Sequence, residues 1–219
     1  MPPRTIAIGD IHGCLAALDR VLAAIEPLAN DTLIVLGDYV DRGSDSRGVI
    51  ARLRQLAERC RLVVLTGNHE EMLLAARDDE VERDAWLRYG GAETLASYGA
   101  ASLEGLPAAD IEWILQGADG FETATHLFVH ANYLPDLPLA RQPVEVLRWE
   151  SLWQRVPPRH ISGKIAIVGH TAQHEGEIWD LGHLLCIDTY CHGGGWLTAM
   201  EVDTRQVWQA SRAGELRAK

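Results

Sequence analysis

Long apolar runs are missing from this 219-residue sequence, in which no stretch approaches the ~20 residues that a membrane-spanning helix needs. The N-terminus also lacks the apolar segment of a signal peptide, since residues 1–5 lead straight into an expected strand. The four cysteines form no Cys-x-x-Cys pair; they are Cys14, Cys60, Cys186 and Cys191. These absences predict a cytoplasmic protein with no membrane partner, whose reduced cysteines pack as small apolar residues.

Positive charge is also scarce. Asp and Glu number 31 against 20 Lys and Arg, which gives a formal net charge of −11, and the only lysines are Lys164 and Lys219. A balance this acidic argues against broad electrostatic binding to nucleic acid or to an anionic membrane. It does not exclude an anionic substrate, because bound metal cations can dominate the local field at a site.

What the sequence does contain is a repeated unit: a short apolar run, then a glycine, then a side chain able to bind a metal ion. The five copies cover residues 6–13, 33–43, 62–70, 127–132 and 165–171, the fourth without its glycine. Such runs predict strands buried in a parallel sheet, and ligands bind just beyond the carboxyl ends of these strands. The pattern therefore predicts a polynuclear metal site. Its candidate ligands are Asp10, His12, Asp38, Asn68, His130 and His170.

The order of the apolar patterns predicts how the chain is organised. Strands alternate with helices over residues 4–70, which favours a parallel sheet with right-handed crossovers. Residues 77–118 have a helical pattern broken by glycines, and we expect an insertion that could cover one side of the site. From residue 120 the expected strands are short and closely spaced, which indicates a mostly antiparallel or mixed second half. The length suits a single domain over residues 1–219.

Residues beside the candidate ligands could supply acid–base chemistry and phosphate binding. Two divalent cations about 3.5–4 Å apart can clamp a phosphoryl group and activate water at neutral pH. His69 directly follows Asn68 and, in an extended turn, would face away from the metal and could protonate a leaving group. Asp41 could orient that imidazole, and Arg42 offers a planar fork for phosphate oxygens. The alternative for Asp41 and Arg42 is an exposed ion pair that contributes little.

These residues make the sequence resemble a known family. The blocks at 9–13, 37–43 and 67–70 resemble the three signature blocks of the phosphoprotein-phosphatase family of calcineurin-like metallophosphoesterases, in order, spacing and residue type. His130 and the block at 169–171 resemble the two downstream metal histidines of that family. The resemblance extends over about residues 5–208. It implies an α/β fold with a central two-sheet β-sandwich flanked by helices, in which the first half forms one sheet and the later strands form the other.

The resemblance also implies roles for individual residues. One metal would be held by Asp10, His12 and Asp38, and the other by Asp38, Asn68, His130 and His170, with Asp38 bridging the two. His69 would be the general acid, Asp41 its partner and Arg42 a phosphate clamp. We expect two divalent metal ions, manganese in first place, with iron and zinc as alternatives, because mixed nitrogen and oxygen ligands suit all three.

The match is incomplete in two places. The family has a second phosphate-binding arginine between the downstream histidines, for which Arg148 and Arg155 are both candidates, with Arg141 and Arg159 in reserve. The segment 188–195 resembles the Tyr-Cys loop beside the family's active site, and it makes Tyr190 a candidate for substrate binding. Alternatively, its glycines only form a tight turn between strands.

The sequence thus predicts a metal-dependent phosphomonoesterase, in first place a serine/threonine protein phosphatase of the bacterial or phage type. The alternative is a bis(5'-nucleosyl)-tetraphosphatase that hydrolyses diadenosine tetraphosphate. Scarce lysine and an acidic insertion argue against that highly charged substrate, although Trp86, Tyr89 and Tyr98 could stack on its bases. A non-catalytic binding module is disfavoured by the complete ligand set. The sequence leaves the physiological substrate and the oligomeric state open.

Overall fold

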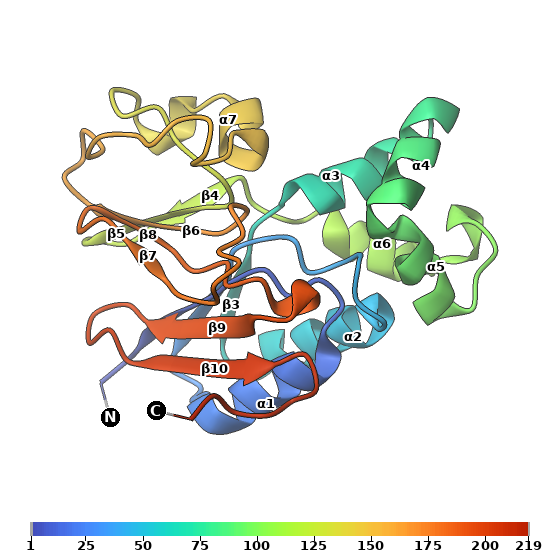
Figure 1. The fold of residues 1–219 in the computed structure, drawn as a ribbon, viewed down its shortest axis with the longest axis horizontal. Coiled ribbons are helices and arrows are strands. Elements are labelled where there is room, and N and C mark those ends of the chain that lie inside the picture. The colour runs from blue at the N-terminus through green and yellow to red at the C-terminus, as the bar shows by residue number, and fades with distance from the viewer. Residues whose placement is uncertain (1, 219) are drawn as a thin grey trace.

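A computed structural model describes residues 2–218, and Figure 1 shows two β-sheets packed together with helices on their outer sides. One sheet has the order β10-β9-β1-β2-β3 and the other has the order β4-β5-β6-β8-β7. The first sheet consists of β1 (Thr5–Ile8), β2 (Thr32–Val35), β3 (Arg61–Val64), β9 (Trp196–Glu201) and β10 (Val207–Ser211). The second consists of β4 (Gly120–Glu122), β5 (His126–Val129), β6 (Ile165–Val168), β7 (Trp179–Asp180) and β8 (Leu184–Cys186). The two-sheet α/β sandwich expected from the sequence is confirmed.

The strands β1 and β2 are apolar after the threonine that begins each of them, because both faces of their sheet are covered. Ile6 and Ile8 of β1 pack into the core beneath the helices. Ala7 points the other way and packs between the sheets in a cluster that includes Phe128 and Ile167. Alternate side chains of a strand point to opposite faces, so burial on both faces removes the polar positions that an exposed face would show.

The outer faces of the sheets carry the helices. α1 (Leu15–Ile25) and α2 (Ser46–Ala57) cover the first sheet, and α7 (Val144–Trp149) lies over the second, where Leu147 is buried (Figure 1). The start of α2 is fixed by Asp45, whose carboxylate accepts a hydrogen bond from the Gly48 amide at 2.7 Å. Within residues 2–218, no helix combines the length and the apolar character that crossing a membrane would require.

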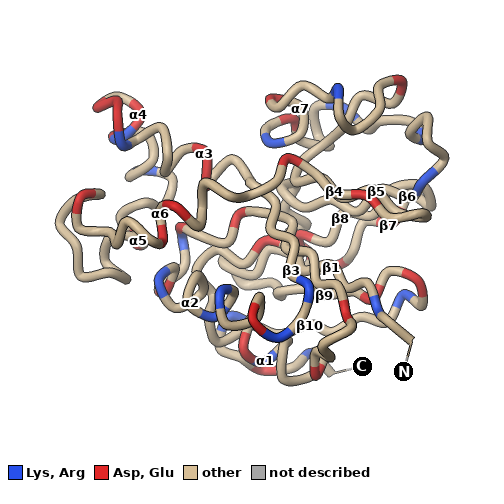
Figure 2. Tube along the Cα trace, turned by 180° about the vertical axis from the view of Figure 1, so that it is seen from behind, with Lys and Arg blue, Asp and Glu red and all other residues tan. Residues whose placement is uncertain are grey.

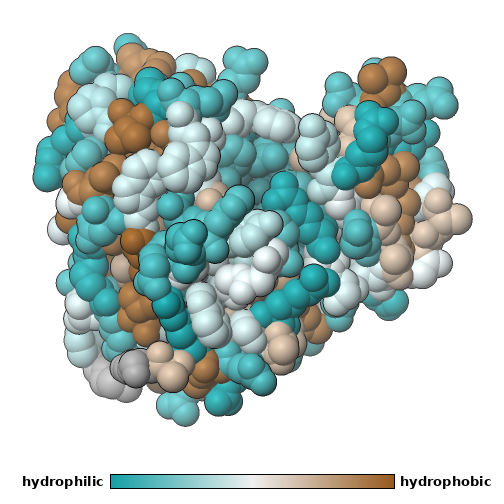
Figure 3. All heavy atoms as spheres, viewed as in Figure 1, coloured by the Kyte–Doolittle hydropathy of each residue, from teal (hydrophilic) through white to brown (hydrophobic). Residues whose placement is uncertain are grey.

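Residues 77–118 are helical, as the sequence predicts, and project to one side of the sandwich. After α3 (Asn68–Ala75) the chain forms α4 (Glu80–Trp86), a π-helical turn at Leu87–Gly91, α5 (Ala92–Tyr98) and α6 (Ala108–Ile114). Gly90 interrupts the helical backbone with a φ of 117°, a conformation that glycine adopts without a steric penalty. Figure 3 shows a notch between this projection and the part of the molecule that carries α7, with mostly hydrophilic residues along it.

One expectation about the sheets was wrong. The sequence suggested that the first half of the chain forms one sheet and that all later strands form the other. In the structure β9 and β10 return to the first sheet, and β9 pairs with β1 in antiparallel register, Ala7 opposite Met200. The second sheet has a parallel centre, β5-β6-β8, with antiparallel edges. Strand partners depend on pairing between distant segments, which a local apolar pattern does not specify.

Candidate active site

The loops that follow β1, β2 and β3 are joined by hydrogen bonds into one framework. The carbonyl of Asp38 accepts the amides of Ile11 and His12 at 3.1 and 2.8 Å, which joins the first loop to the second. The parallel, in-register pairing of these strands brings their carboxyl ends to one edge of the sheet. The candidate ligands on the three loops are therefore close together, although they are far apart in the sequence.

Glu70 joins the second and third loops, a role that sequence reasoning missed. Its buried carboxylate accepts the backbone amides of Gly67, Asp38, Tyr39 and Val40 at 2.9, 2.8, 2.9 and 3.2 Å. Glu70 is the third residue of α3, and a glutamate at that position commonly caps the start of its helix. That spacing is the signal that could have identified it.

Left-handed backbone conformations concentrate at this edge of the sheet. Of the eight non-glycine residues described with positive φ, six lie in the site loops. These six are His12, Asp38, Asp41, Arg42, His170 and Tyr190. Such conformations are strained for residues with a side chain, and they persist where surrounding contacts fix them, commonly at functional sites.

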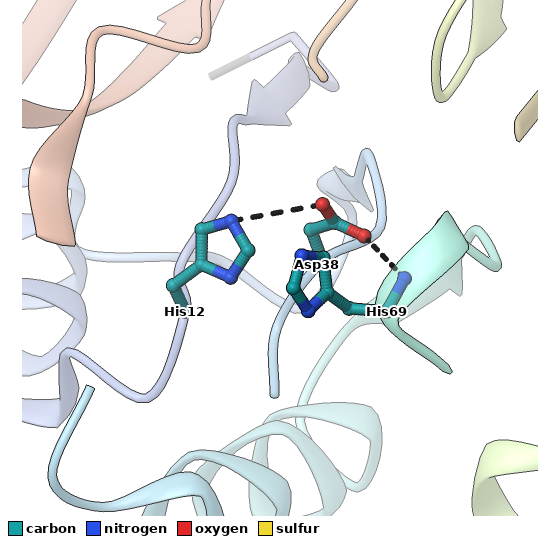
Figure 4. A group of neighbouring side chains, drawn as sticks. All are labelled: His12, Asp38 and His69. Carbon is teal, nitrogen blue, oxygen red and sulfur yellow. Dashed lines mark hydrogen bonds and ion pairs between the residues drawn. The ribbon is translucent and has the colours of Figure 1, made fainter. Parts of the chain in front are cut away.

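Asp38 lies at the centre of the candidate ligands. Figure 4 shows its carboxylate between His12 and His69; Oδ2 is 3.6 Å from Nε2 of His12, and Oδ1 accepts the His69 amide at 3.0 Å. Oδ1 is also 3.4 Å from Nε2 of His130. Donor atoms of His12, Asp38 and His69 lie within 4.8 Å of one another, and so do those of Asp38, His130 and His170. Asp38 belongs to both groups, the position that a bridging ligand requires.

Backbone carbonyl groups set the tautomers of two histidines. Nδ1 of His12 lies 3.0 Å from the Val40 carbonyl oxygen, and Nδ1 of His130 lies 2.8 Å from that of Leu36. Because a carbonyl oxygen only accepts, each Nδ1 carries the proton and each Nε2 presents a lone pair. Burial lowers the pKa of both imidazoles, which favours the neutral form that binds metal.

The amide oxygen of Asn68 completes this side of the site. Asn68 Oδ1 lies 3.1 Å from Nε2 of His130 and 2.9 Å from Nδ1 of His170. Burial also lowers the pKa of His170, to about 4. The opposite nitrogen of His170, Nε2, lies 3.0 Å from the Trp149 carbonyl oxygen. A carboxylate, an amide oxygen and neutral imidazoles that face one another form a donor set that fits divalent metal ions.

Asp10 is adjacent to a second carboxylate, Asp188, that sequence reasoning did not identify. The Asp10 carboxylate accepts the His170 amide at 3.2 and 3.0 Å from its two oxygens. Burial raises the pKa of Asp188 to about 6, and burial together with the charge of Asp188 raises the pKa of Asp10. A bound cation would stabilise both charged forms. The structure links all six predicted ligands through contacts, but Asp10 belongs to neither donor group around Asp38, and the division of the ligands between two ions remains a prediction.

His69 and Asp41 form a buried pair. Nδ1 of His69 lies 2.8 Å from Oδ2 of Asp41. Burial alone would lower the pKa of His69, but the charge of Asp38 and the hydrogen bond to Asp41 outweigh burial and raise it. The geometry of this pair differs from the prediction in one respect. His69 is in the first turn of α3, not in an extended turn, so it points about 100° away from Asn68.

Arg42 lies between two histidines. Its Nη1 is 3.2 Å from Nε2 of His192 and 3.5 Å from Nε2 of His12. His192, for which the sequence pattern indicated no role, follows Tyr190 in the glycine-rich loop. The Tyr190 ring stacks on His174, with ring centroids 4.4 Å apart, and meets His192 edge-on at 4.9 Å. The loop therefore lies beside Arg42, as the predicted substrate-binding role of Tyr190 requires.

The two candidates for the second phosphate clamp differ in their surroundings. Arg148, on α7, donates to Glu71 at 2.8 Å and to Asp119 at 2.5 Å. The carbonyl of the next residue, Trp149, contacts His170. Arg155 instead donates to Glu150 at 2.9 Å and to the Tyr133 carbonyl oxygen at 3.0 Å. Burial and, to a smaller extent, the nearby charge of Arg148 lower the pKa of His130, so Arg148 lies close to one candidate metal ligand.

Comparisons with known proteins agree with this geometry. The model of the calcineurin-like phosphoesterase family matches residues 3–197. Serine/threonine-protein phosphatase 1 of Salmonella typhimurium is 30% identical over 213 residues, which cover 89% of this chain and 90% of that protein. The symmetrical bis(5'-nucleosyl)-tetraphosphatase of Janthinobacterium sp. is 32% identical over 143 residues, or 63% of this chain, and the match spans only 46% of that relative. A solved structure provisionally described as a diadenosine tetraphosphatase superposes with a TM-score of 0.72 at 22% identity, covering 95% of this chain and 93% of that one, which shows a shared fold.

Proposed function

The chain belongs to the calcineurin-like phosphoesterase family, whose members are metal-dependent hydrolases of phosphoester bonds, and we propose that it is a serine/threonine protein phosphatase. The observation that carries this choice is the match with Salmonella serine/threonine-protein phosphatase 1, which extends over nearly the whole of both chains. The match with the tetraphosphatase relative covers less than half of that protein.

Two divalent ions would be held by the ligands around Asp38, and we propose manganese for both positions. When bound, they supply Lewis acidity and activate water as the nucleophile. Asp10 and His12 would hold one ion, and Asn68, His130 and His170 the other, with Asp38 between them. The buried carboxylates Asp10 and Asp188 support the proposal of a cation at this position, because without one their two negative charges would repel each other.

The residues of the chain itself would orient the phosphate and move the proton. His69, with Asp41 on its Nδ1, would donate the Nε2 proton to the leaving alkoxide. Nε2 is buried and has no hydrogen-bond partner within residues 2–218, so it is available for that donation. Arg42 would hold the phosphate oxygens, and Arg148, on α7, would assist.

Charge around the site supports a singly phosphorylated substrate. Figure 2 shows acidic and basic residues together at α4. The segment 77–88 carries Asp78, Asp79, Glu80, Glu82 and Asp84 against Arg77, Arg83 and Arg88. A dinucleoside polyphosphate, with about four negative charges, calls for an excess of cations that this segment lacks.

We also propose one domain with the helical insertion at about 77–118, and a cytoplasmic location, since all four cysteines are free and buried.

Symmetrical cleavage of diadenosine tetraphosphate is the second candidate, and one structural feature favours it. The rings of Trp153 and Trp179 stack with centroids 5.1 Å apart, and both line a recess of about 600 Å³. His174 lines the same recess and stacks on Tyr190. Exposed aromatic rings beside a phosphate site can stack on a nucleobase. Several further relatives are also symmetrical bis(5'-nucleosyl)-tetraphosphatases, matched over parts of their length.

One comparison of substrates decides between the candidates. The measurement is kcat/KM for a phosphothreonine peptide and for diadenosine tetraphosphate, with the same protein and the same manganese concentration. We expect the peptide to be preferred. A value tenfold or more higher for the dinucleotide, equivalent to about 1.4 kcal/mol of transition-state preference, would contradict the protein-phosphatase proposal. Trp153→Ala is the matched variant, since it should lower kcat/KM for the dinucleotide more than for the peptide if the recess binds a base.

A further inference from the structure

The carboxylate of Asp41 is bound by two side chains that belong to the helical insertion. Nε1 of Trp86, the last residue of α4, donates to both carboxylate oxygens at 3.1 and 2.9 Å. The hydroxyl of Thr94, in α5, donates to Oδ1 at 2.7 Å. With His69 on Oδ2, the carboxylate contacts three donor groups and has no exposed surface. Its orientation is therefore set from outside its own loop.

Thr94 also contacts the backbone of the residue whose side chain it binds. The Asp41 amide donates to Thr94 Oγ1 at 3.0 Å and to Ser46 Oγ at 3.0 Å, and the two hydroxyl oxygens are 2.9 Å apart. Asp41 has a φ of 68° and Arg42 a φ of 65°, two consecutive left-handed residues. The hydroxyl of Thr94 thus fixes the backbone and the side chain of Asp41 at a strained turn.

The π-helical turn between α4 and α5 allows both side chains to reach the same carboxylate. The Arg42 amide donates to the Gly90 carbonyl at 3.2 Å, so the turn packs directly on the Asp41–Arg42 backbone. A Cβ atom at Gly90 would lie 2.5 Å from the Arg42 nitrogen. A Cβ atom at Gly91 would lie 2.3 Å from the Trp86 ring. The two glycines permit a close approach that any side chain would prevent.

We propose that Trp86 and Thr94 are positioning residues for the proton donor His69, acting through Asp41. Neither touches a candidate metal ligand through these contacts; both bind the carboxylate that orients the His69 ring. The helical insertion thus contributes directly to the geometry of proton transfer. Trp86, which the sequence suggested could stack on a base, is fully buried and has its indole nitrogen on Asp41. This inference rests on the proposed acid role of His69.

The test uses the dependence of the rate on the leaving group. The variants are Thr94→Val, which keeps the shape of the side chain and removes the hydroxyl, Thr94→Ser, which keeps the hydroxyl, and Trp86→Phe. Substrates are glycerol phosphate, whose alkoxide needs a proton, and p-nitrophenyl phosphate, whose phenolate does not. We expect Thr94→Val and Trp86→Phe to lower kcat for glycerol phosphate by roughly tenfold to a hundredfold, and much less for p-nitrophenyl phosphate. Thr94→Ser should restore most of the loss, and bound metal should be unchanged.

The control is Ser97→Ala, which removes another hydroxyl of α5. That hydroxyl donates to the Thr94 carbonyl and accepts a hydrogen bond from the Arg47 amide. It should leave the ratio of the two rates unchanged. In an Asp41→Asn background, Thr94→Val should add little further loss, because residues that act through one group are not additive.

His69→Asn, measured in parallel, separates this inference from the proposed function. If His69→Asn shows the leaving-group effect while Thr94→Val and Trp86→Phe do not, the positioning role is wrong and the acid role stands. If His69→Asn slows both substrates equally, the acid role is wrong, and the positioning role fails with it. Equal loss on both substrates in Thr94→Val, or loss of metal from it, would show a structural role only. If Trp86→Phe does not fold, the Thr94→Val and Thr94→Ser pair decides.

Discussion

Nδ1 of His69 lies 2.8 Å from Oδ2 of Asp41, and the two side chains are 1% and 0% exposed. A histidine held this way keeps one tautomer, because the proton on Nδ1 faces the carboxylate. The opposite nitrogen, Nε2, is then the atom that can exchange a proton with a substrate. The hydrogen bond to Asp41 thus determines which nitrogen of His69 reacts, and Trp86 and Thr94 orient the Asp41 carboxylate that accepts this bond.

Replacing His69 by asparagine tests the acid role directly. His69→Asn should retain both metal equivalents and slow hydrolysis of an alkyl phosphate by ~10²–10⁴-fold, the usual contribution of a general acid. The loss should shrink for p-nitrophenyl phosphate, whose leaving group needs less protonation. Steady-state kcat on the two substrates and metal analysis of the purified variant check both parts. The same loss on both substrates would contradict the acid role.

Asp38 should be the ligand whose replacement does most damage. Asp38→Asn removes charge from the one side chain that belongs to both donor groups, so we expect near-total loss of activity and loss of one metal equivalent. The fold should persist, because the backbone carbonyl of Asp38 still accepts the amides of Ile11 and His12. Metal analysis and circular dichroism provide the measurements. A purified variant that holds both metals would exclude the bridging position.

Arg148→Ala and Arg155→Ala should differ in their effect on inorganic phosphate as an inhibitor. Arg148→Ala should raise KM, lower kcat and weaken phosphate inhibition, because Arg148 sits one residue from the carbonyl that contacts His170. Arg155→Ala should act through stability alone, since its guanidinium bonds Glu150 and the Tyr133 carbonyl. The inhibition constant for phosphate separates them. Unchanged inhibition in both variants would place the second clamp elsewhere, with Arg141 and Arg159 next to be tested.

A stability prediction concerns Asp31, far from the metal ligands. Its carboxylate accepts the Leu28 amide at 2.8 Å and the Arg4 guanidinium at 2.5 Å. Burial alone would raise the pKa of Asp31, but these hydrogen bonds outweigh burial and lower it. The charged form therefore stabilises the fold at neutral pH, and this contribution is lost as pH falls from about 3.9 through the lowered pKa.

Asp31→Asn should consequently lower the free energy of unfolding at pH 7 by about 2 kcal/mol, the scale of a hydrogen bond to a charged group. The difference from the parent protein should narrow as pH falls below about 4. Urea unfolding at several pH values provides the comparison, with Asp19→Asn, whose ion pair with Arg52 is exposed, as the control. A difference that is constant with pH would show that the charge of Asp31 does not matter.

The clustering of the candidate metal ligands could be predicted from the sequence because each follows an apolar run that is buried in a sheet. That signal lies within a few consecutive residues, as at Leu36, Gly37 and Asp38, and pairing of the strands then brings the residues that carry it together. The residues that hold this arrangement in place have no such signal. The spacing of Glu70 predicts its capping bond to Gly67 but not its bonds to amides of another loop, and Asp188 lies beside Asp10 although the two are far apart in the chain.

Trp86 and Thr94 show the same limit. The sequence indicated Trp86 as a ring that could stack on a base and indicated no role for Thr94. Their contact with Asp41 depends on how the insertion packs on a turn that lies 45 and 53 residues earlier in the chain. The position of β9 beside β1 was missed for the same reason. In each case the determining contact joins distant segments, and the free energy that selects it comes from the complete packed core.

The pairing of β9 with β1 has a consequence for synthesis of the chain. β1 is translated long before β9, its second neighbour in the sheet, where Ile6 pairs with Glu201. Until then one edge of β1 has unpaired backbone groups, and exposed strand edges of this kind can pair with other chains. His170 follows β6, so it is also translated after β1. A nascent chain that ends before His170 therefore lacks one of the candidate metal ligands.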